Sequence, residues 1–471
     1  MRLDRLLGAL SIIDVRGDPS AVDISDVTHD SATVRPGSLF CCLPGARRNG
    51  HDFAARAVGD GAVALLVEQP QAVADGVVQL VVDDARSSMA PLAAAFHGDP
   101  SRSMQVVGVT GTNGKTTTTF LVRSILEAAG LPTGVVGTMT ESRTTPESPV
   151  LQARLAAFVD EGKRAAAIEV SSVGLVQRRV DAVWFAATIF TNLSQDHLDE
   201  HGTMERYFEA KATLFEPERT AVGVVNADDD YGRRLLDAAP VPMRPFSLLD
   251  AVDLELNTGW STFRWDGESV RLPLDGAFNV SNALAAATVA RELCVDRSTI
   301  AAGLSSIETV AGHAEAVDVG QEFRVVVDYA HTPLALESVL RSARRAAGEH
   351  GRVLVVFGCG GQRDPSKRGP MGWAASSAAD VIVVTSDNPR NEDPDAIIAA
   401  IVEGATGGSQ VLVEPDRRSA IAAAFSRASP GDVVVIAGKG HEVGQTIGDR
   451  VLPFDDKTVA VELLERVRGA S

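Results

Sequence analysis

The sequence GVTGTNGKTTTT occupies positions 108–119, between the apolar run Met104–Val109 and a helical run, Thr116–Ala129. A glycine-rich turn between a strand and a helix presents backbone N–H groups and a helix N-terminus, which together bind phosphate oxygens. In such a loop Lys115 neutralises phosphate charge and the Thr116 hydroxyl binds Mg²⁺. The strict phosphate-loop spacing would place a glycine where Val109 stands. The strand, the Gly-Lys-Thr core and the helix together nevertheless predict a nucleotide-binding turn.

Apolar runs alternate with helical stretches on both sides of this loop. Buried strands alternating with helices predict an α/β protein with mostly parallel sheets covered on both faces. In the middle of the chain the further strands are expected at Ala165–Val170, Ala186–Phe190 and Val222–Val225, with a helix at Ser281–Leu293. The last part repeats the pattern, with strands expected at Phe323–Val327, Val353–Phe357, Val381–Val384, Val411–Val413 and Val433–Ala437. We therefore expect a second doubly wound sheet there, with functional loops at the carboxyl ends of its strands.

The length of 471 residues is too great for one hydrophobic core and predicts three domains. The first, residues 1–98, has short strands at Val63–Glu68 and Gln79–Val82 and a helix at Ser87–Phe96, after a short amphipathic helix at the N-terminus. The breaker-rich segment His97–Ser101 predicts a linker. The second domain then covers residues 99–309, ending near Thr309, and the third covers residues 310–471.

The charge balance excludes some classes of function. The net charge is −18, from 44 basic and 62 acidic residues. This balance argues against a nucleic-acid-binding protein, which needs clustered Lys and Arg. No run of roughly 18 apolar residues is present, so no membrane insertion is expected. We expect a monomer in the cytoplasm.

Three polar groups in the middle of the chain follow or accompany predicted strands. Glu169, at a strand end, could reach a Mg²⁺ ion, or simply cap a helix. The segment from Asp196 to Asp199 reads DHLD and is dense in possible ligands, although His197 alone is more often a hydrogen-bonding surface residue. Lys211 lies on an amphipathic helix and would by default be solvated.

Four predicted strand ends in the last part of the chain carry charged and amide groups. Since carboxyl ends of parallel strands share one edge of a sheet, these groups should converge there. Such a set of carboxylates, an amide and basic groups suits a zwitterionic, multiply charged substrate. The four segments are DYAHTP at 328–333, GCGGQRD at 358–364 with Lys367 and Arg368 after it, DNPR at 387–390 and GKGHE at 438–442.

In their order and wording these motifs resemble the Mur ligases of peptidoglycan synthesis, and among them the enzymes that add the third peptide residue. The resemblance runs from about Asp30 to Leu464. It implies a UDP-binding domain, a central ATPase domain and a C-terminal Rossmann-like domain. It also implies that ATP and Mg²⁺ activate the carboxylate of UDP-N-acetylmuramoyl-L-alanyl-D-glutamate as an acyl phosphate. The amine of meso-diaminopimelate then forms the amide.

The same resemblance implies roles for individual residues. Catalytic roles fall to Lys115, Glu169, His197 and Lys211. The metal ligands would be Thr116, Glu169, His197 and Lys211, the last if carbamylated. The implied ATP-binding residues are Gly111, Thr112, Asn113, Gly114, Lys115, Thr116, Thr117, Asn279, Asn282 and Asp328. The implied UDP-substrate residues are Ser31, His51, Thr144, Thr145, Ser171, Gln177 and Arg179. The implied amino-acid-binding residues are Arg363, Asp387, Asn388, Pro389, Arg390, Gly438 and Glu442.

Three positions and the length of one segment differ from the pattern of the family. Ala32 and His313 stand where the family has arginine, Val173 stands where it has histidine, and the segment from Gly137 to Thr144 is shorter. These differences keep open an alternative, a paralogous Mur-type ligase of specialised metabolism that joins another amine to another carboxylate. A third reading is a catalytically inactive binding or scaffolding protein, which the presence of Lys115 and the three other catalytic candidates argues against.

Overall fold

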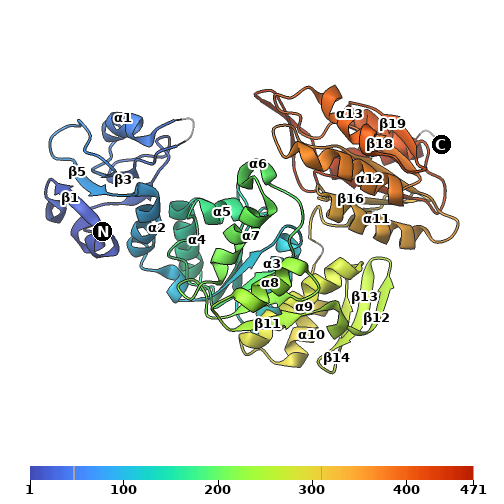
Figure 1. Ribbon diagram of the computed structural model, residues 1–471, viewed down its shortest axis with the longest axis horizontal. Helices are drawn as coiled ribbons and strands as arrows, with labels where there is room; N and C mark the ends of the chain where they lie inside the picture. Colours follow the sequence, from blue (N-terminus) through green and yellow to red (C-terminus); the bar gives the residue numbers. More distant parts are fainter. Residues whose placement is uncertain (46–47, 309, 470–471) are drawn as a thin grey trace.

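The computed structural model describes residues 1–45, 48–308 and 310–469 and shows three sheet-based units (Figure 1). The first unit lies at one end, the central unit follows it, and the C-terminal unit packs beside the central one. The α/β class with mostly parallel sheets is confirmed. The domain boundaries stay a prediction, and the boundary residue Thr309 lies outside the described residues. Across the described residues, no helix combines the length and hydropathy needed to cross a bilayer.

The first unit is a five-stranded sheet in the order β1-β5-β4-β3-β2, antiparallel only at its β1 edge. Its start, predicted as an amphipathic helix, is a 3₁₀ helix, Leu3–Ala9, that buries Leu3 and Leu6. The strands and helices are β1 Ile12–Arg16, β2 Asp26–Thr28, β3 Ser38–Cys41, β4 Ala64–Val67, β5 Val78–Val82, α1 Ala54–Gly59 and α2 Ala85–Phe96.

The central unit is a parallel six-stranded sheet in the order β11-β10-β9-β6-β8-β7. The predicted strands and helices of this unit are present, with ends shifted by a few residues. Its strands are β6 Gln105–Thr110, β7 Thr133–Val136, β8 Ala165–Glu169, β9 Ala187–Phe190, β10 Gly223–Asn226 and β11 Met243–Phe246. Its helices are α3 Lys115–Ala128, α4 Ser148–Asp160, α5 Ser172–Val176, α6 Leu198–His201, α7 Met204–Ala212, α8 Asp230–Ala238, α9 Ala277–Glu292 and α10 Arg297–Ser305.

An antiparallel three-stranded sheet adjoins α10 and was not predicted. Its strands are β12 Val252–Asn257, β13 Trp260–Trp265 and β14 Glu268–Leu272. Phe263, Trp265 and Val270 turn inward and join the same hydrophobic core as α3 and α9. This small sheet therefore extends the core on one face of the central sheet.

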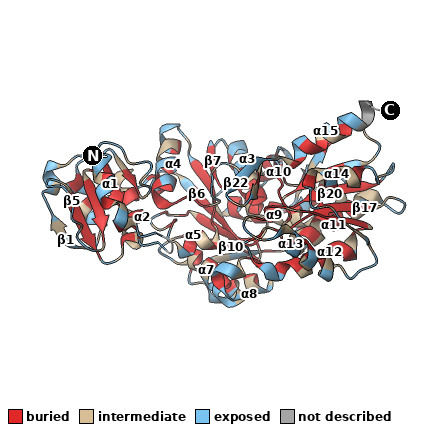
Figure 2. Ribbon diagram, turned by 90° about the horizontal axis from the view of Figure 1, so that it is seen from above, coloured by how far each residue is buried: buried red, intermediate tan, exposed pale blue. Residues whose placement is uncertain are grey.

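The C-terminal unit is a second six-stranded sheet, ordered β15-β16-β20-β17-β18-β19, in which only β15 is antiparallel. Its central strands β17 and β20 are buried and coloured red in Figure 2, and hydrophobic clusters cover both faces of the sheet. The elements are β15 Glu315–Val317, β16 Arg324–Asp328, β17 Val353–Phe357, β18 Val381–Val384, β19 Gln410–Val413, β20 Val433–Ala437, α11 Pro333–Ala347, α12 Arg368–Ala378, α13 Pro394–Gly404, α14 Arg417–Phe425 and α15 Asp456–Gly469, with a hairpin of β21 Gly444–Ile447 and β22 Arg450–Pro453.

A fully buried ion pair links α14 to α15 beneath this sheet. Arg417 Nε donates to Asp456 Oδ1 at 2.8 Å, and Arg417 Nη2 donates to Asp456 Oδ2 at 2.7 Å. Both side chains are 0% exposed. Removing one partner of such a pair strands the other charge away from water, which costs more than the pair itself contributes.

We expect Arg417→Met to lower the free energy of unfolding by about 3–5 kcal/mol, because Asp456 is left charged and buried. The neighbouring Arg418 pairs with Glu462 on the surface, and Arg418→Met should cost about 1 kcal/mol or less. Urea unfolding followed by circular dichroism measures both. Equal effects of the two variants would contradict this account, whereas Arg417→Met with Asp456→Leu should recover much of the loss.

Candidate active site

A cavity of about 610 Å³ lies where the central and C-terminal units meet. Strand ends and loops of both units form its wall. The predicted site residues that line it are Thr112, Asn113, Gly114, Lys115, Thr116, Thr144, Thr145, Glu169, Ser171, Gln177, Arg179, His197, Lys211, Asp328, Arg363, Asp387, Asn388, Arg390, Gly438 and Glu442. Three predicted groups, for nucleotide, acceptor and amino acid, thus share one cavity.

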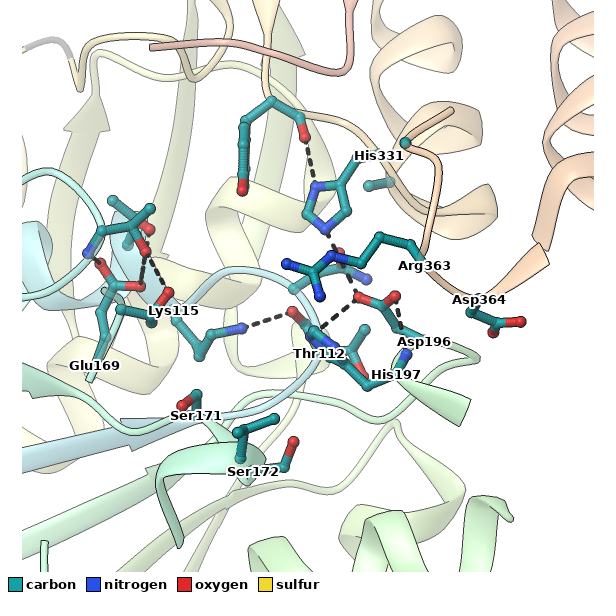
Figure 3. Close-up of a pocket in the computed structure, with 18 of the residues that line it drawn as sticks. Thr112, Lys115, Glu169, Ser171, Ser172, Asp196, His197, His331, Arg363 and Asp364 are labelled. Carbon is teal, nitrogen blue, oxygen red and sulfur yellow. Dashed lines mark hydrogen bonds and ion pairs between the residues drawn. The ribbon is translucent and has the colours of Figure 1, made fainter. Parts of the chain in front are cut away.

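The phosphate loop connects β6 to α3, and α3 begins at Lys115. Gly111 and Gly114 have φ of 147° and 83°, and a side chain at either would collide with Thr191 or Asn282. Glycine is required because the backbone is left-handed and closely packed at these two positions. Lys115 Nζ folds back over the loop and donates to Thr112 O at 2.8 Å (Figure 3). It also donates to Gly111 O at 3.0 Å.

Glu169 ends β8 directly beside the start of α3 (Figure 3). Its Oε2 accepts hydrogen bonds from the hydroxyls of Thr116 at 3.1 Å and Thr138 at 3.2 Å, and its Oε1 accepts from Thr138 N at 3.0 Å. Burial raises the pKa of Glu169, while the charge of Lys115 and these hydrogen bonds act in the opposite direction. Burial likewise lowers the pKa of Lys115. A cation in the cavity would stabilise the carboxylate of Glu169, and an anion would stabilise the ammonium group of Lys115.

His197 and Lys211 form the next part of the wall. His197 has a φ of 55° and precedes α6. Burial, together with the charges of Lys211 and Lys115, lowers the pKa of His197 to about 4 despite nearby Asp196, so its ring is neutral at physiological pH. Lys211 Nζ donates to Gly111 O at 2.8 Å and lies 4.6 Å from the ring centroid of Tyr207. Burial, then Lys115, holds the pKa of Lys211 well below its usual value.

The residues around the phosphate loop suit Mg²⁺ brought in with a nucleotide. Within the described residues, no group of three or more His, Cys, Asp and Glu side chains could hold a metal by itself. The hydroxyl of Thr116 and the carboxylate of Glu169, 3.1 Å apart, are hard oxygen ligands. Mg²⁺ is commonly held by one or two such groups, with water and phosphate oxygens completing its coordination. The donor set therefore fits this ion.

The DNPR segment at 387–390 forms the C-terminal wall and is held by a buried lysine. Lys439 is 0% exposed, and its Nζ lies 3.0 Å from Glu442 Oε2, 3.3 Å from Asn388 Oδ1 and 3.7 Å from Asp387 Oδ1. Asn388 Nδ2 also donates to Glu442 Oε2 at 2.8 Å. This network fixes the amide and two carboxylates relative to one another before any ligand arrives.

Arg390 is positioned by the β21–β22 hairpin. Its backbone, with φ of 53°, donates to Thr446 O at 3.0 Å and accepts from Gly448 N at 2.8 Å. Its Nη1 donates to Gly361 O at 2.7 Å, which directs the guanidinium toward the segment that carries Arg363. Burial, then the charge of Arg363, lowers the pKa of Arg390. Two guanidinium groups thus line one end of the cavity and favour an anionic ligand.

Asp196 links the central and C-terminal units. His331 Nε2 and Lys367 Nζ, both from the C-terminal unit, lie 3.6 Å and 3.4 Å from its carboxylate oxygens (Figure 3). Burial opposes ionisation of Asp196, but the hydrogen bond from His331 and the charge of Lys367 hold its pKa well below the usual value. A further contact joins Thr332 Oγ1 to Asn113 Oδ1 at 3.1 Å. The phosphate loop is therefore in direct contact with the C-terminal unit.

The predicted acceptor residues form a hydrogen-bonded group at the other end of the cavity. Thr145 Oγ1 donates to Glu169 O at 2.9 Å and contacts Ser171 Oγ at 3.1 Å. Arg179 donates to Thr145 O at 2.9 Å and pairs with Glu147 at 2.9 Å. Arg86 of the first unit also reaches Glu147, at 3.3 Å. This end of the cavity therefore lies toward the first unit.

Some predicted residues do not line this cavity. Ser31 and His51 lie in the first unit, where His51 Nε2 accepts from Glu68 N at 3.1 Å. Pro389, Gly111 and Thr117 belong to lining segments without being lining residues themselves. Asn279 and Asn282 lie on α9, where Asn279 Nδ2 donates to Asp275 O at 2.8 Å.

Other lining residues were not among the predicted site residues. They are Thr138, Arg143, Ser172, Val173, Asp196, Asp199, Glu200, Tyr207, His313, Tyr329, Ala330, His331, Ala335, Gly360, Asp364 and Lys367. Asp196, His331 and Asp364 stand inside quoted motifs, so their position was a usable signal. Lys367 follows the 358–364 motif closely in the sequence and was part of the same strand-end group, whereas Arg143 is recognised as a lining residue only in the structure.

The phosphate loop lies beside the strand-end carboxylate of Glu169, and the C-terminal α/β unit forms the opposite wall of the cavity. This arrangement suits an ATP-dependent ligase. Three family models match the chain: "Mur ligase family, catalytic domain" over residues 23–97, "Mur ligase middle domain" over 109–290, and "Mur ligase, glutamate ligase domain" over 312–440. The chain belongs to the Mur ligase family.

Relatives with assigned names match over nearly their whole length. A "UDP-N-acetylmuramoyl-L-alanyl-D-glutamate--2,6-diaminopimelate ligase" of Streptomyces coelicolor is 44% identical, covering 97% of this chain and 96% of that protein. One of the same name from Syntrophomonas wolfei is 42% identical, covering 98% and 99%. A solved structure of that name is 31% identical with a TM-score of 0.67, covering 99% of each chain. MurF of Acinetobacter baumannii, 22% identical with a TM-score of 0.72 and 98% of each chain covered, shares the fold.

Proposed function

We propose that this protein joins meso-diaminopimelate to UDP-N-acetylmuramoyl-L-alanyl-D-glutamate at the expense of ATP, as the names of its relatives state for those proteins. The observation that carries the proposal is the single cavity shared by the phosphate loop, the Thr145–Ser171 group and the wall that holds Arg390. We also propose that it acts as a monomer in the cytoplasm, on small substrates and without nucleic acid.

In the first half of the reaction the acceptor carboxylate attacks the γ-phosphorus of ATP, and ADP leaves. A carboxylate is a poor electrophile, and the acyl phosphate formed here is a good one. The roles proposed for the loop residues 111–117 are to enclose the phosphates with backbone N–H groups and to offset their charge with Lys115. Thr116 and Glu169 would hold Mg²⁺, which supplies charge neutralisation at the phosphates. Asn279, Asn282 and Asp328 would hold the adenosine part.

In the second half the amine of diaminopimelate attacks the acyl carbon, the amide forms, and phosphate leaves. The acceptor would be held by Thr144, Thr145, Ser171, Gln177 and Arg179, with Ser31 and His51 nearer the uridine end. The incoming amino acid would be held by the wall of Arg363, Asp387, Asn388, Pro389, Arg390, Gly438 and Glu442. The distal carboxylate of diaminopimelate, which lysine lacks, suits bidentate pairing with a guanidinium.

A direct test mixes purified protein, ATP, Mg²⁺ and the UDP-linked acceptor with either meso-diaminopimelate or L-lysine. Mass spectrometry of the products should show the amide with diaminopimelate and little or none with lysine. If no product forms with either amino acid, the proposal is refuted. Product only with another acceptor, found in a screen of carboxylates, would favour the paralogous ligase of specialised metabolism.

We further propose that Lys211 is carbamylated in the active enzyme. Its neutral amine, favoured by burial, adds to CO₂ to give a carbamate and a proton. The carbamate is an anion, and with His197 it could support a second Mg²⁺. Lys211 Nζ donates to Gly111 O of the phosphate loop at 2.8 Å, and this contact supports a role for the modification close to the transferred phosphate.

We expect removal of CO₂ and bicarbonate to lower phosphate release, and added bicarbonate to restore it, because only the carbamate carries the required negative charge. Lys211→Met should have low activity that does not respond to bicarbonate. ¹³C NMR of protein supplied with ¹³C-bicarbonate should show a carbamate signal that the variant lacks. Full activity without CO₂, and no such signal, would contradict carbamylation.

A further inference from the structure

His313 lines the cavity, and the reaction proposed above assigns it no role. The backbone on both sides of it is fixed. Gly312 has a φ of 68°, and a side chain there would collide with the backbone of His441. Gly312 N donates to Glu315 Oε2 at 2.7 Å, and Ala314 N donates to Asp328 Oδ2 at 2.7 Å. The ring of His313 is therefore held on the cavity wall between two loops that carry candidate site residues.

The imidazole of His313 packs between two other rings. It stacks on His441 with 6.2 Å between centroids and 23° between planes, and it meets Tyr329 edge-on at 5.9 Å. Its Nε2 is buried and, within the described part of the chain, has no hydrogen-bond partner. A buried ring nitrogen without a partner is unfavourable and uncommon in folded proteins. A ligand oxygen in the cavity would supply the missing partner.

Three basic groups and two carboxylates surround His313. Burial, followed by the charges of His441, His331 and Lys115, lowers its pKa to about 3, so the ring is neutral in the free protein. The titratable groups that face it are Lys115 at the start of α3, Asp328 at the end of β16, Tyr329 and His331 after β16, His441 after β20, and Glu315 on its own segment. An anion held beside Lys115 would oppose all of the positive neighbours at once.

We propose that His313 hydrogen-bonds to the polyphosphate of the bound nucleotide and takes up a proton as the nucleotide binds. The inference rests on the ATP site proposed above. Phosphate charge next to the ring stabilises the imidazolium, so the complex holds more protons than the free protein and its nucleotide. Affinity is then highest at low pH and falls as pH rises through the pKa that His313 has in the complex.

Titration calorimetry with Mg²⁺ and ADP tests this, because it measures binding without catalysis. Measurements in buffers of different ionisation enthalpy, from mildly acidic to mildly alkaline pH, give the protons taken up. His313→Ala should weaken ADP binding by about tenfold or more, since it removes a hydrogen bond to a charged group. His313→Gln keeps a neutral donor but cannot be protonated, so it should bind less tightly than the wild type mainly at acidic pH.

A matched control is His350→Gln, at an exposed histidine of the same unit, which should behave as the wild type. Wild-type affinity and proton uptake in both His313 variants would overturn the inference while leaving the ATP site intact. A wild-type protein that binds no nucleotide would overturn the proposed function as well. Circular dichroism of the variants separates lost binding from misfolding, and His313→Gln decides the matter if His313→Ala does not fold.

Discussion

Lys115→Met is expected to lower phosphate release by about 100- to 1,000-fold, because the half-buried positive charge proposed to act on the transferred phosphate is removed. Methionine keeps the length and apolar stem of the side chain, so packing at the start of α3 is preserved. In the structure Lys115 Nζ binds Gly111 O and Thr112 O, and it must turn from these carbonyls to reach a phosphate. The variant therefore tests charge rather than shape.

The appropriate control is Lys163→Met, which removes a lysine from a loop outside the cavity and should leave turnover unchanged. Steady-state phosphate release at saturating substrates measures both variants, and nucleotide binding shows whether the loss lies in kcat or in affinity. If Lys115→Met turned over at nearly the rate of the wild type, the proposed role of the phosphate-loop lysine in the reaction would be contradicted.

Arg390→Ala is expected to lower kcat/KM for diaminopimelate by about 100-fold or more, since a site built to pair with a carboxylate loses its donor. Lysine, which has no distal carboxylate, gains nothing from Arg390 and should be affected much less. The preference for diaminopimelate over lysine therefore shrinks. Arg390→Lys keeps the charge but loses the planar fork, and should recover only part of the preference.

The KM for ATP serves as the internal control for the Arg390 variants, because the hairpin that positions Arg390 is separate from the phosphate loop. Competition between the two amino acids, read by mass spectrometry of the products, gives the preference in one mixture. A preference unchanged in Arg390→Ala would show that another group reads the distal carboxylate, with Arg363 the first alternative to replace.

The sequence predicts the repeated strand–helix pattern because buried parallel strands are continuous apolar runs with a polar residue where each ends. Glu169 and Asp328 are the last residues of β8 and β16, so their placement follows from that pattern. The β12–β14 sheet was missed, although its turn Asp266-Gly267 is a common hairpin signal. In β13 the inward-facing Phe263 and Trp265 alternate with polar residues, a pattern that is typical of a half-buried strand.

Contacts between units could not be predicted in the same way. Asp196 and Lys367 are 171 positions apart, and Thr332 and Asn113 are 219 apart, so no periodicity links them. They depend on how two separately folded sheets dock. A contact within one unit can be equally hard to predict. His51 Nε2 accepts a hydrogen bond from Glu68 N within the first unit, and no sequence motif indicates this contact.

Activation of the acceptor carboxylate by ATP within one cavity is the central step of the proposed reaction. The most direct test supplies UDP-N-acetylmuramoyl-L-alanyl-D-glutamate carrying ¹⁸O in the γ-carboxylate of its glutamate, with ATP, Mg²⁺ and meso-diaminopimelate. If that carboxylate attacks the γ-phosphorus, one of its oxygens leaves with phosphate when the amine adds. Released phosphate should therefore carry one ¹⁸O for each amide formed. Amide formation with unlabelled phosphate would contradict the acyl phosphate and with it the central claim.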